Sequence, residues 1–113
     1  MLKFVVYDDE AVFRSKVVKS IDKVMKNTEI EYCKEEYDKC NSKMMHTIMD
    51  NSKKIYIMDI EIPNGVSGID VARKIRETDW NSIIILVTSH VDMSYEALKA
   101  QIMLLDFISN YFY

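Results

Sequence analysis

The stretch SIIILVT, residues 82–88, is apolar along both of its faces and rich in β-branched residues. Such a run predicts a strand that is buried on both sides of a sheet, as the central strands of parallel sheets are. A second run of this kind, KIYIMD (residues 54–59), precedes it, and residues 68–79 between the two carry apolar side chains at helical spacing. This order of strand, helix and strand indicates two parallel strands joined by a crossover helix.

The alternation of strand and helix continues from this pair along the rest of the chain. Further strands are predicted for residues 2–7, 28–33 and 105–109, and further helices for residues 10–26, 38–51 and 93–104. Five strands with helical crossovers predict an α/β fold, a flavodoxin-like doubly wound parallel sheet with the strand order 2-1-3-4-5. Because the chain ends directly after the fifth predicted strand, we expect that the last helix of such a fold is missing from it.

Polar side chains stand at the points where three of the predicted strands end. Asp8 and Asp9 follow the first strand, Asp59 ends the third and Thr88 ends the fourth. The carboxyl ends of parallel strands meet at one edge of the sheet, where open α/β sheets bind ligands. Three carboxylates gathered there would raise one another's pKa values unless a cation neutralised them, and an oxygen-only ligand set suits Mg²⁺.

A helix cap is the alternative explanation for Asp8 or Asp9, since Asp is a favoured N-cap residue. An Asp–Asp pair after a strand is a weak signal when it stands alone. The combination of both acids with Asp59 and Thr88, each at the end of a strand, favours a magnesium site.

The composition favours a globular domain and argues against a nucleic-acid-binding protein. The 113 residues are 49% hydrophobic, which predicts one domain with a packed core, and the net charge of −3 argues against nucleic-acid binding by this segment itself. The sequence has neither a long apolar run nor a plausible signal peptide, so we expect a cytoplasmic protein that does not enter a membrane.

The spacing of Cys33 and Cys40 fits neither a zinc site nor a redox motif, which indicates reduced thiols. The single Pro and both Gly fall within PNGVSG (residues 63–68), which marks this loop as special.

Four motifs together resemble one family. VVYDDE (residues 5–10), IYIMDIEIP (55–63), ILVTSH (85–90) and LLDFIS (104–109) resemble the response-regulator receiver domain, most closely the receivers of LytTR-type (AgrA-like) two-component regulators. The resemblance spans the whole chain. It implies a signalling domain, not an enzyme, that accepts a phosphoryl group from a sensor histidine kinase and regulates an attached output domain. Residues 1–113 would then be the N-terminal part of a longer regulator.

The resemblance also implies roles for individual residues. Asp59 would be the phosphoacceptor, and Mg²⁺ would be held by Asp8, Asp9, Asp59 and the main-chain carbonyl of Glu61. Thr88 would hydrogen-bond a phosphoryl oxygen and carry the signal, together with Phe107 at the aromatic switch position. An ordinary core role is an equally good explanation for Phe107.

One position departs from the family pattern. Receivers usually carry a Lys three residues after the aromatic switch position, and here Asn110 stands in its place. Asn supplies hydrogen-bond donors but no charge, so phosphorylation would be slower or less well coupled. The alternative is a pseudo-receiver, a protein-interaction module without a phosphorylation cycle. Because the carboxylates and Asp59 are all present, we favour a working phosphoacceptor. A flavin- or nucleotide-binding flavodoxin-like protein is disfavoured, because the acids of the first loop would repel phosphate.

The resemblance implies partners as well. Receivers commonly self-associate through the fourth helix and fifth strand, and a homodimer there could use the apolar residues Met93, Tyr95, Leu98, Ile102 and Met103. DNA would be bound by the missing output domain. His90 could sense the charge of a phosphoryl group, because His titrates near neutral pH, but an exposed loop residue is the simpler interpretation.

Overall fold

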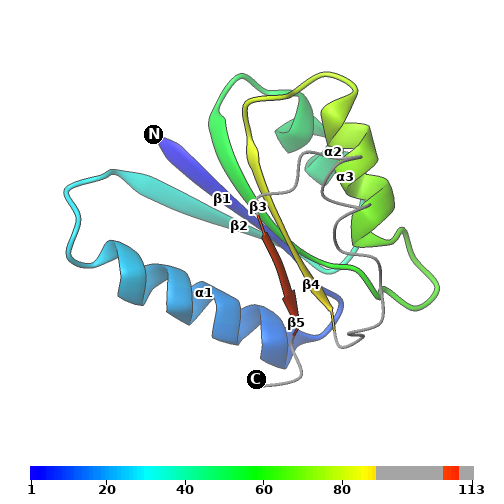
Figure 1. The fold of residues 1–113 in the computed structure, drawn as a ribbon, viewed down its shortest axis with the longest axis horizontal. Helices are drawn as coiled ribbons and strands as arrows, with labels where there is room; N and C mark the ends of the chain where they lie inside the picture. Colours follow the sequence, from blue (N-terminus) through cyan, green and yellow to red (C-terminus); the bar gives the residue numbers. More distant parts are fainter. Residues whose placement is uncertain (89–105, 110–113) are drawn as a thin grey trace.

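The computed structural model describes residues 1–88 and 106–109, and the side chains of residues 1–87. Its elements in chain order are β1 (Leu2–Tyr7), α1 (Ala11–Met25), β2 (Tyr32–Tyr37), α2 (Ser42–Met49), β3 (Lys53–Asp59), α3 (Gly68–Arg76), β4 (Ile83–Thr88) and β5 (Asp106–Ser109). All neighbouring strands are parallel, and the five-stranded sheet has the order β2-β1-β3-β4-β5. The predicted flavodoxin-like α/β fold and its strand order are therefore confirmed (Figure 1).

The three strands β1, β3 and β4 begin and end within one residue of their predicted positions. Apolar residues dominate each of them, and each lies between two neighbouring strands in the sheet. A strand in that position is covered on both faces, so its sequence can be apolar without interruption. The register of β3 on β4 runs from Ile55↔Ile83 to Asp59↔Val87, which brings the two strand ends to the same edge.

The prediction of the second strand at residues 28–33 is wrong, since β2 spans Tyr32–Tyr37. This segment contains the charged residues Lys34, Glu35 and Glu36, which argue against a strand when the sequence is read alone. At the edge of the sheet these charges find partners. Lys34 forms an ion pair with an Asp of α1, and Glu35 forms one with a Lys of β1.

The helices are shorter than the periodicity predicts. α2 begins after Asn41, whose side chain accepts a hydrogen bond of 2.9 Å from the amide of Met44 and so caps the helix. α3 ends at Arg76, where Lys and Arg side chains in the last turn suit the negative end of the helix. The helix predicted for residues 93–104 lies outside the described residues. Within residues 1–88, no helix has the length and apolarity that crossing a membrane requires.

The two faces of the sheet carry different helices. α1 covers one face, and α2 and α3 cover the other (Figure 1). Side chains of β1 alternate between the faces: Val5 and Tyr7 join the core under α2 and α3, and Phe4 and Val6 join the core under α1.

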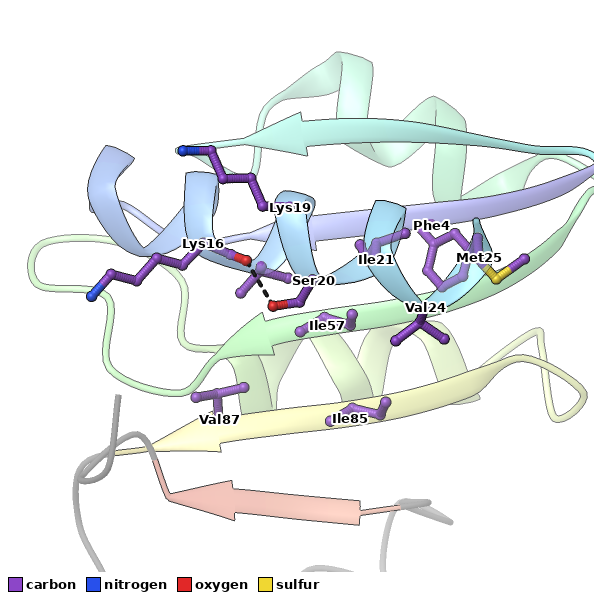
Figure 2. A pocket seen from close by; sticks show the side chains of 11 residues that line it. Phe4, Lys16, Lys19, Ser20, Ile21, Val24, Met25, Ile57, Ile85 and Val87 are labelled. Atoms are coloured by element: carbon purple, nitrogen blue, oxygen red, sulfur yellow. Dashed lines mark hydrogen bonds between the residues drawn. The ribbon is translucent and has the colours of Figure 1, made fainter. Parts of the chain in front are cut away.

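The core under α1 is the smaller one. A groove of about 500 Å³ lies between α1 and the sheet (Figure 2). Ile57, Ile85 and Val87 line it from β3 and β4, and Lys16 and Val24 line it from the helix. Within the described part of the chain, this sheet face is therefore covered less completely than the opposite one.

Candidate metal centre

Three carboxylates meet at the carboxyl edge of the sheet. Asp8 and Asp9 follow β1, Asp59 ends β3, and each offers an oxygen that lies within 4.8 Å of the other two. β1 and β3 are neighbours in register up to Tyr7↔Met58, so the residues that follow must lie side by side. We call Asp8, Asp9 and Asp59 the acid cluster.

Main-chain groups hold two of the three carboxylates in place. Asp8 Oδ1 accepts a hydrogen bond of 2.9 Å from the amide of Glu10, and Asp59 Oδ1 accepts one of 3.1 Å from the amide of Glu61. Asp8 is buried, Asp59 is half-buried and Asp9 is exposed. The cluster therefore opens to solvent on the side of Asp9, where a ligand can enter.

Among the described residues, the acid cluster has little positive charge beside it. Burial raises the pKa of Asp59 to about 7, and the negative charges of Asp8, Asp9 and Glu10 add to the rise. Burial also raises the pKa of Asp8, and the charge of Arg14 offsets only part of that rise. The Arg14 guanidinium itself donates to the main-chain oxygen of Asp8 at 2.8 Å and not to a carboxylate of the cluster.

This arrangement fits a divalent cation. The donors are all oxygens, as hard cations such as Mg²⁺ and Ca²⁺ prefer. A bound cation would favour the ionised form of Asp59, and so offset both its burial and the repulsion from its acidic neighbours. The chemistry of the donor set therefore supports the sequence-based interpretation of Asp8, Asp9 and Asp59 as candidate metal ligands.

The alternative that Asp8 or Asp9 caps α1 is wrong. The N-cap residue of α1 is Glu10, and no side chain caps this helix. Asp8 accepts from the amide of Glu10, which lies before the first turn of the helix. Asp8 precedes the N-cap residue Glu10, and its carboxylate accepts from the amide of that residue instead of from an amide of the first helical turn.

The special loop predicted at residues 63–68 approaches Asp59 closely. A Cβ atom on Gly68 would lie 2.3 Å from the main-chain oxygen of Asp59, a distance that no side chain tolerates. The Gly68 amide donates to the Ile60 oxygen at 3.4 Å, which closes the loop on the end of β3. Glycine is thus required at this position so that α3 can begin directly against the strand that carries Asp59.

Tyr7 is a residue that sequence reasoning did not single out. It is fully buried at the end of β1, and its hydroxyl donates a hydrogen bond of 2.6 Å to the main-chain oxygen of Val66. A signal was present in the sequence, because Tyr7 places a hydroxyl at the end of the apolar residues 4–6, directly before Asp8.

Several predicted site residues are located only in part. Thr88 ends β4 and pairs with Ser109, so its backbone lies at the same edge as the acid cluster. Phe107 lies on β5 and pairs with Leu86. Their side chains, and His90, Asn110 and the apolar stripe of residues 93–103, lie outside the described residues.

One family model matches almost the whole chain. The family model for the response regulator receiver domain matches residues 4–112. A response regulator from Burkholderia pseudomallei, solved with a phosphorylated aspartic acid, a calcium ion and citrate, has a TM-score of 0.74 at 12% identity. That match covers 97% of this chain and 60% of the other. No curated protein sequence matches this chain significantly.

Two further solved structures are similar over a larger share of their own length. The response regulator TrrA from Thermotoga maritima, in complex with Mg²⁺ and BeF, has a TM-score of 0.75 at 21% identity, covering 99% of this chain and 89% of that one. The chemotaxis protein CheY4 from Vibrio cholerae has a TM-score of 0.75 at 14% identity, covering 100% of this chain and 89% of that one. At these identities the likeness to solved structures establishes the fold.

Proposed function

The chain belongs to the response regulator receiver domain family, and on that premise we propose that Asp59 accepts a phosphoryl group in a Mg²⁺-dependent reaction. The donor would be the phosphohistidine of a sensor kinase. The observation that carries the proposal is the acid cluster, three carboxylates within 4.8 Å of one another at the carboxyl edge of the sheet.

The residues suited to hold Mg²⁺ are Asp8, Asp9 and Asp59, with the main-chain carbonyl of Glu61. A bound Mg²⁺ ion supplies positive charge that offsets the charge on the phosphoryl oxygens and keeps the carboxylates ionised. The ionised Asp59 carboxylate attacks the phosphorus atom, so that an oxygen–phosphorus bond forms while the bond to the donor's leaving atom breaks. Because the Glu61 amide holds Asp59 Oδ1, the other oxygen is the better placed nucleophile.

Related structures support both parts of this proposal. The Burkholderia regulator contains a phosphorylated aspartic acid with a calcium ion, and TrrA was solved with Mg²⁺ and BeF. A shared fold does not by itself mean that this chain binds either ligand. The acid cluster gives this chain the donor set that such ligands need.

The response to phosphorylation would pass through Thr88 and Phe107. We place Thr88 as the hydrogen-bond donor to a phosphoryl oxygen and Phe107 as the residue that repacks. Asn110 would supply hydrogen bonds without charge in place of the usual Lys, so we expect slower phosphorylation or weaker coupling.

The wider setting is proposed on the same basis. We infer a cytoplasmic two-component regulator whose output is a DNA-binding domain, LytTR-type from the sequence motifs. A DNA-binding regulator from Staphylococcus aureus is among the similar structures, at 22% identity, and it is of the LuxR family. Self-association through the fourth helix and fifth strand would link phosphorylation to the output.

Intact-mass measurement after incubation with acetyl phosphate tests the proposal. We expect one phosphoryl adduct with Mg²⁺, none with EDTA and none in Asp59→Asn. Asp70→Asn is the matched control, because Asp70 is an exposed acid on α3 whose carboxylate pairs with Arg73 and is not a member of the cluster, and it should label like the wild type. A wild-type chain that stays unlabelled while a control receiver is labelled would refute the proposal and favour the phosphorylation-independent interaction module.

A further inference from the structure

We propose that Tyr7 is a positioning residue for the acid cluster, because its hydroxyl ties the loop that follows Asp59 to the strand that precedes Asp8. The inference rests on the proposed function for its consequence on phosphorylation. Its consequence for metal binding can be tested separately.

Tyr7 connects the two segments that supply the carboxylates. It is the last residue of β1 and is covalently joined to Asp8. Its hydroxyl reaches the main-chain oxygen of Val66 at 2.6 Å, although the two residues are 59 positions apart in the chain. A single fully buried side chain thus fixes the end of β1 relative to the far end of the loop after Asp59.

The loop between β3 and α3, residues 60–67, in turn fixes Asp59. Near its start, the Glu61 amide holds Asp59 Oδ1 at 3.1 Å. At its end, Gly68 lies against the main-chain oxygen of Asp59 and donates to the Ile60 oxygen at 3.4 Å. Because both ends of the loop meet at Asp59, a displacement at Val66 would move the groups that orient the phosphoacceptor.

Core packing alone does not account for the hydroxyl. The ring of Tyr7 fills the core under α2 and α3, and the ring of a phenylalanine would fill the same space. The hydroxyl adds a hydrogen bond to one specific carbonyl in the loop beside the acid cluster. A tie of this kind is how outer residues commonly fix the geometry of metal and catalytic groups.

Tyr37 offers a matched comparison. It is the register partner of Tyr7 on β2, it is buried, and it belongs to the same core. Its hydroxyl bonds to Thr47 at 3.0 Å and to the Glu35 carboxylate, neither of which belongs to the acid cluster. Removing the Tyr37 hydroxyl therefore removes a buried hydrogen-bonding group on the neighbouring strand without touching the loop of residues 60–67.

The test compares Tyr7→Phe with Tyr37→Phe in the full chain. Mg²⁺ affinity is measured by calorimetry, and the initial rate of labelling by acetyl phosphate is measured at saturating Mg²⁺ by intact mass. We expect Tyr7→Phe to weaken Mg²⁺ binding about tenfold and to slow labelling about tenfold. Tyr37→Phe should change both by less than about twofold, since it affects stability and not the site.

Hydrogen exchange supplies the readout that separates positioning from general destabilisation. Exchange of residues 60–67 should accelerate in Tyr7→Phe and not in Tyr37→Phe. In the wild-type chain, Mg²⁺ should slow exchange in the same loop by reciprocal coupling, a measurement that needs no variant to fold. Wild-type Mg²⁺ affinity and labelling in Tyr7→Phe, equal losses in both variants, or exchange that Mg²⁺ leaves unchanged would each overturn the inference.

The same measurements distinguish a failure of phosphorylation from a failure of positioning by Tyr7. A wild-type chain that binds Mg²⁺ but takes up no phosphoryl group would refute phosphorylation, and a loss of Mg²⁺ affinity in Tyr7→Phe would still support positioning. A labelled wild type with unchanged binding and labelling in Tyr7→Phe would refute positioning alone.

Discussion

In the part of the chain that the structure describes, one cluster of carboxylates has lysine partners and another has none. Asp8, Asp9 and Asp59 meet in the acid cluster, and within residues 1–87 no lysine forms an ion pair with them. Toward the amino ends of β1 and β3, Lys3 pairs with Glu35 at 2.9 Å and with Asp50 at 2.8 Å, and Lys54 pairs with Asp50 at 3.0 Å. We call Lys3, Glu35, Asp50 and Lys54 the paired cluster.

The pKa values of the two clusters move in opposite directions. Burial alone would raise the pKa of Glu35, but hydrogen bonds from Tyr37, Thr47 and Lys3 together lower it to about 2. In the acid cluster burial raises the pKa of Asp59 to about 7, and its acidic neighbours add to the rise. The paired cluster has its cations built in and stabilises the fold, whereas the acid cluster leaves room for a cation from solution.

Removing a lysine from the paired cluster should have the largest effect. Lys54 is buried, and its ammonium also donates to the main-chain oxygens of Asp50 and Ser52 at 2.8 and 3.2 Å. Lys54→Met should lower the free energy of unfolding by about 3 kcal/mol, because it leaves Asp50 and two carbonyls without this donor. Urea denaturation measures the loss. The control is Lys53→Met at the exposed neighbouring position, which should change stability by less than about 0.5 kcal/mol. Equal losses of stability in the two variants would contradict a stabilising role of the buried Lys54 ammonium.

A methyl group at Gly68 should damage the acid cluster through the backbone. Gly68→Ala places a Cβ 2.3 Å from the Asp59 oxygen, and we expect a loss of about 2 kcal/mol together with weaker Mg²⁺ binding. In Gly65→Ala the nearest atom is Ile62 Cγ2 at 2.8 Å, a side chain that can move, so the loss should stay below about 1 kcal/mol. Urea denaturation and calorimetry compare the two variants, and a tolerated Gly68→Ala would contradict the close approach.

The two clusters should also respond differently to pH. Because the pKa of Asp59 is about 7, protons compete with the metal ion below neutral pH. The apparent Mg²⁺ affinity should fall by up to about tenfold for each pH unit below 7. Glu35, with a pKa of about 2, stays ionised in this range, so the paired cluster should remain intact. Calorimetric titrations between pH 5 and 8 measure this, and an affinity that is flat across the range would contradict the raised pKa of Asp59.

The smallest expected changes in stability come from the same substitution, Asp to Asn, made once in each cluster. The pKa of Asp59 is higher in the folded protein than in the unfolded chain, so the folded protein becomes less stable as the pH rises from the unfolded value to the folded value. Asp59→Asn removes this cost and should stabilise the metal-free protein at pH 8 by about 1 kcal/mol. The pKa of Asp50 is instead held low by hydrogen bonds from Lys3, Ser52 and Lys54 that outweigh its burial, so its contribution is present at pH 8. Asp50→Asn should therefore lower stability by about 1 kcal/mol. Thermal unfolding in EDTA compares the variants, and shifts of the same sign would break the contrast.

The strands of the sheet differ in how well the sequence predicts them. β1, β3 and β4 were predicted closely because a strand between two others is covered on both faces and is therefore mostly apolar. The edge strand β2 was misplaced, since its charged residues become acceptable only through partners on α1 and β1. The pairing of Lys54 with Asp50, like the tie from Tyr7 to Val66, depends on which segments fold against each other.

The sequence by itself determined the order of strands and helices, and with it the edge where Asp8, Asp9 and Asp59 converge. That follows because the hydrophobic period of each segment is a local property of the sequence, and the carboxyl ends of parallel strands meet at one edge of the sheet. Only the tertiary structure decided which carboxylates would receive a lysine and which would not. The free energy of a charge depends on burial and on neighbours that lie far apart in the chain, and these exist only after the sheet has formed.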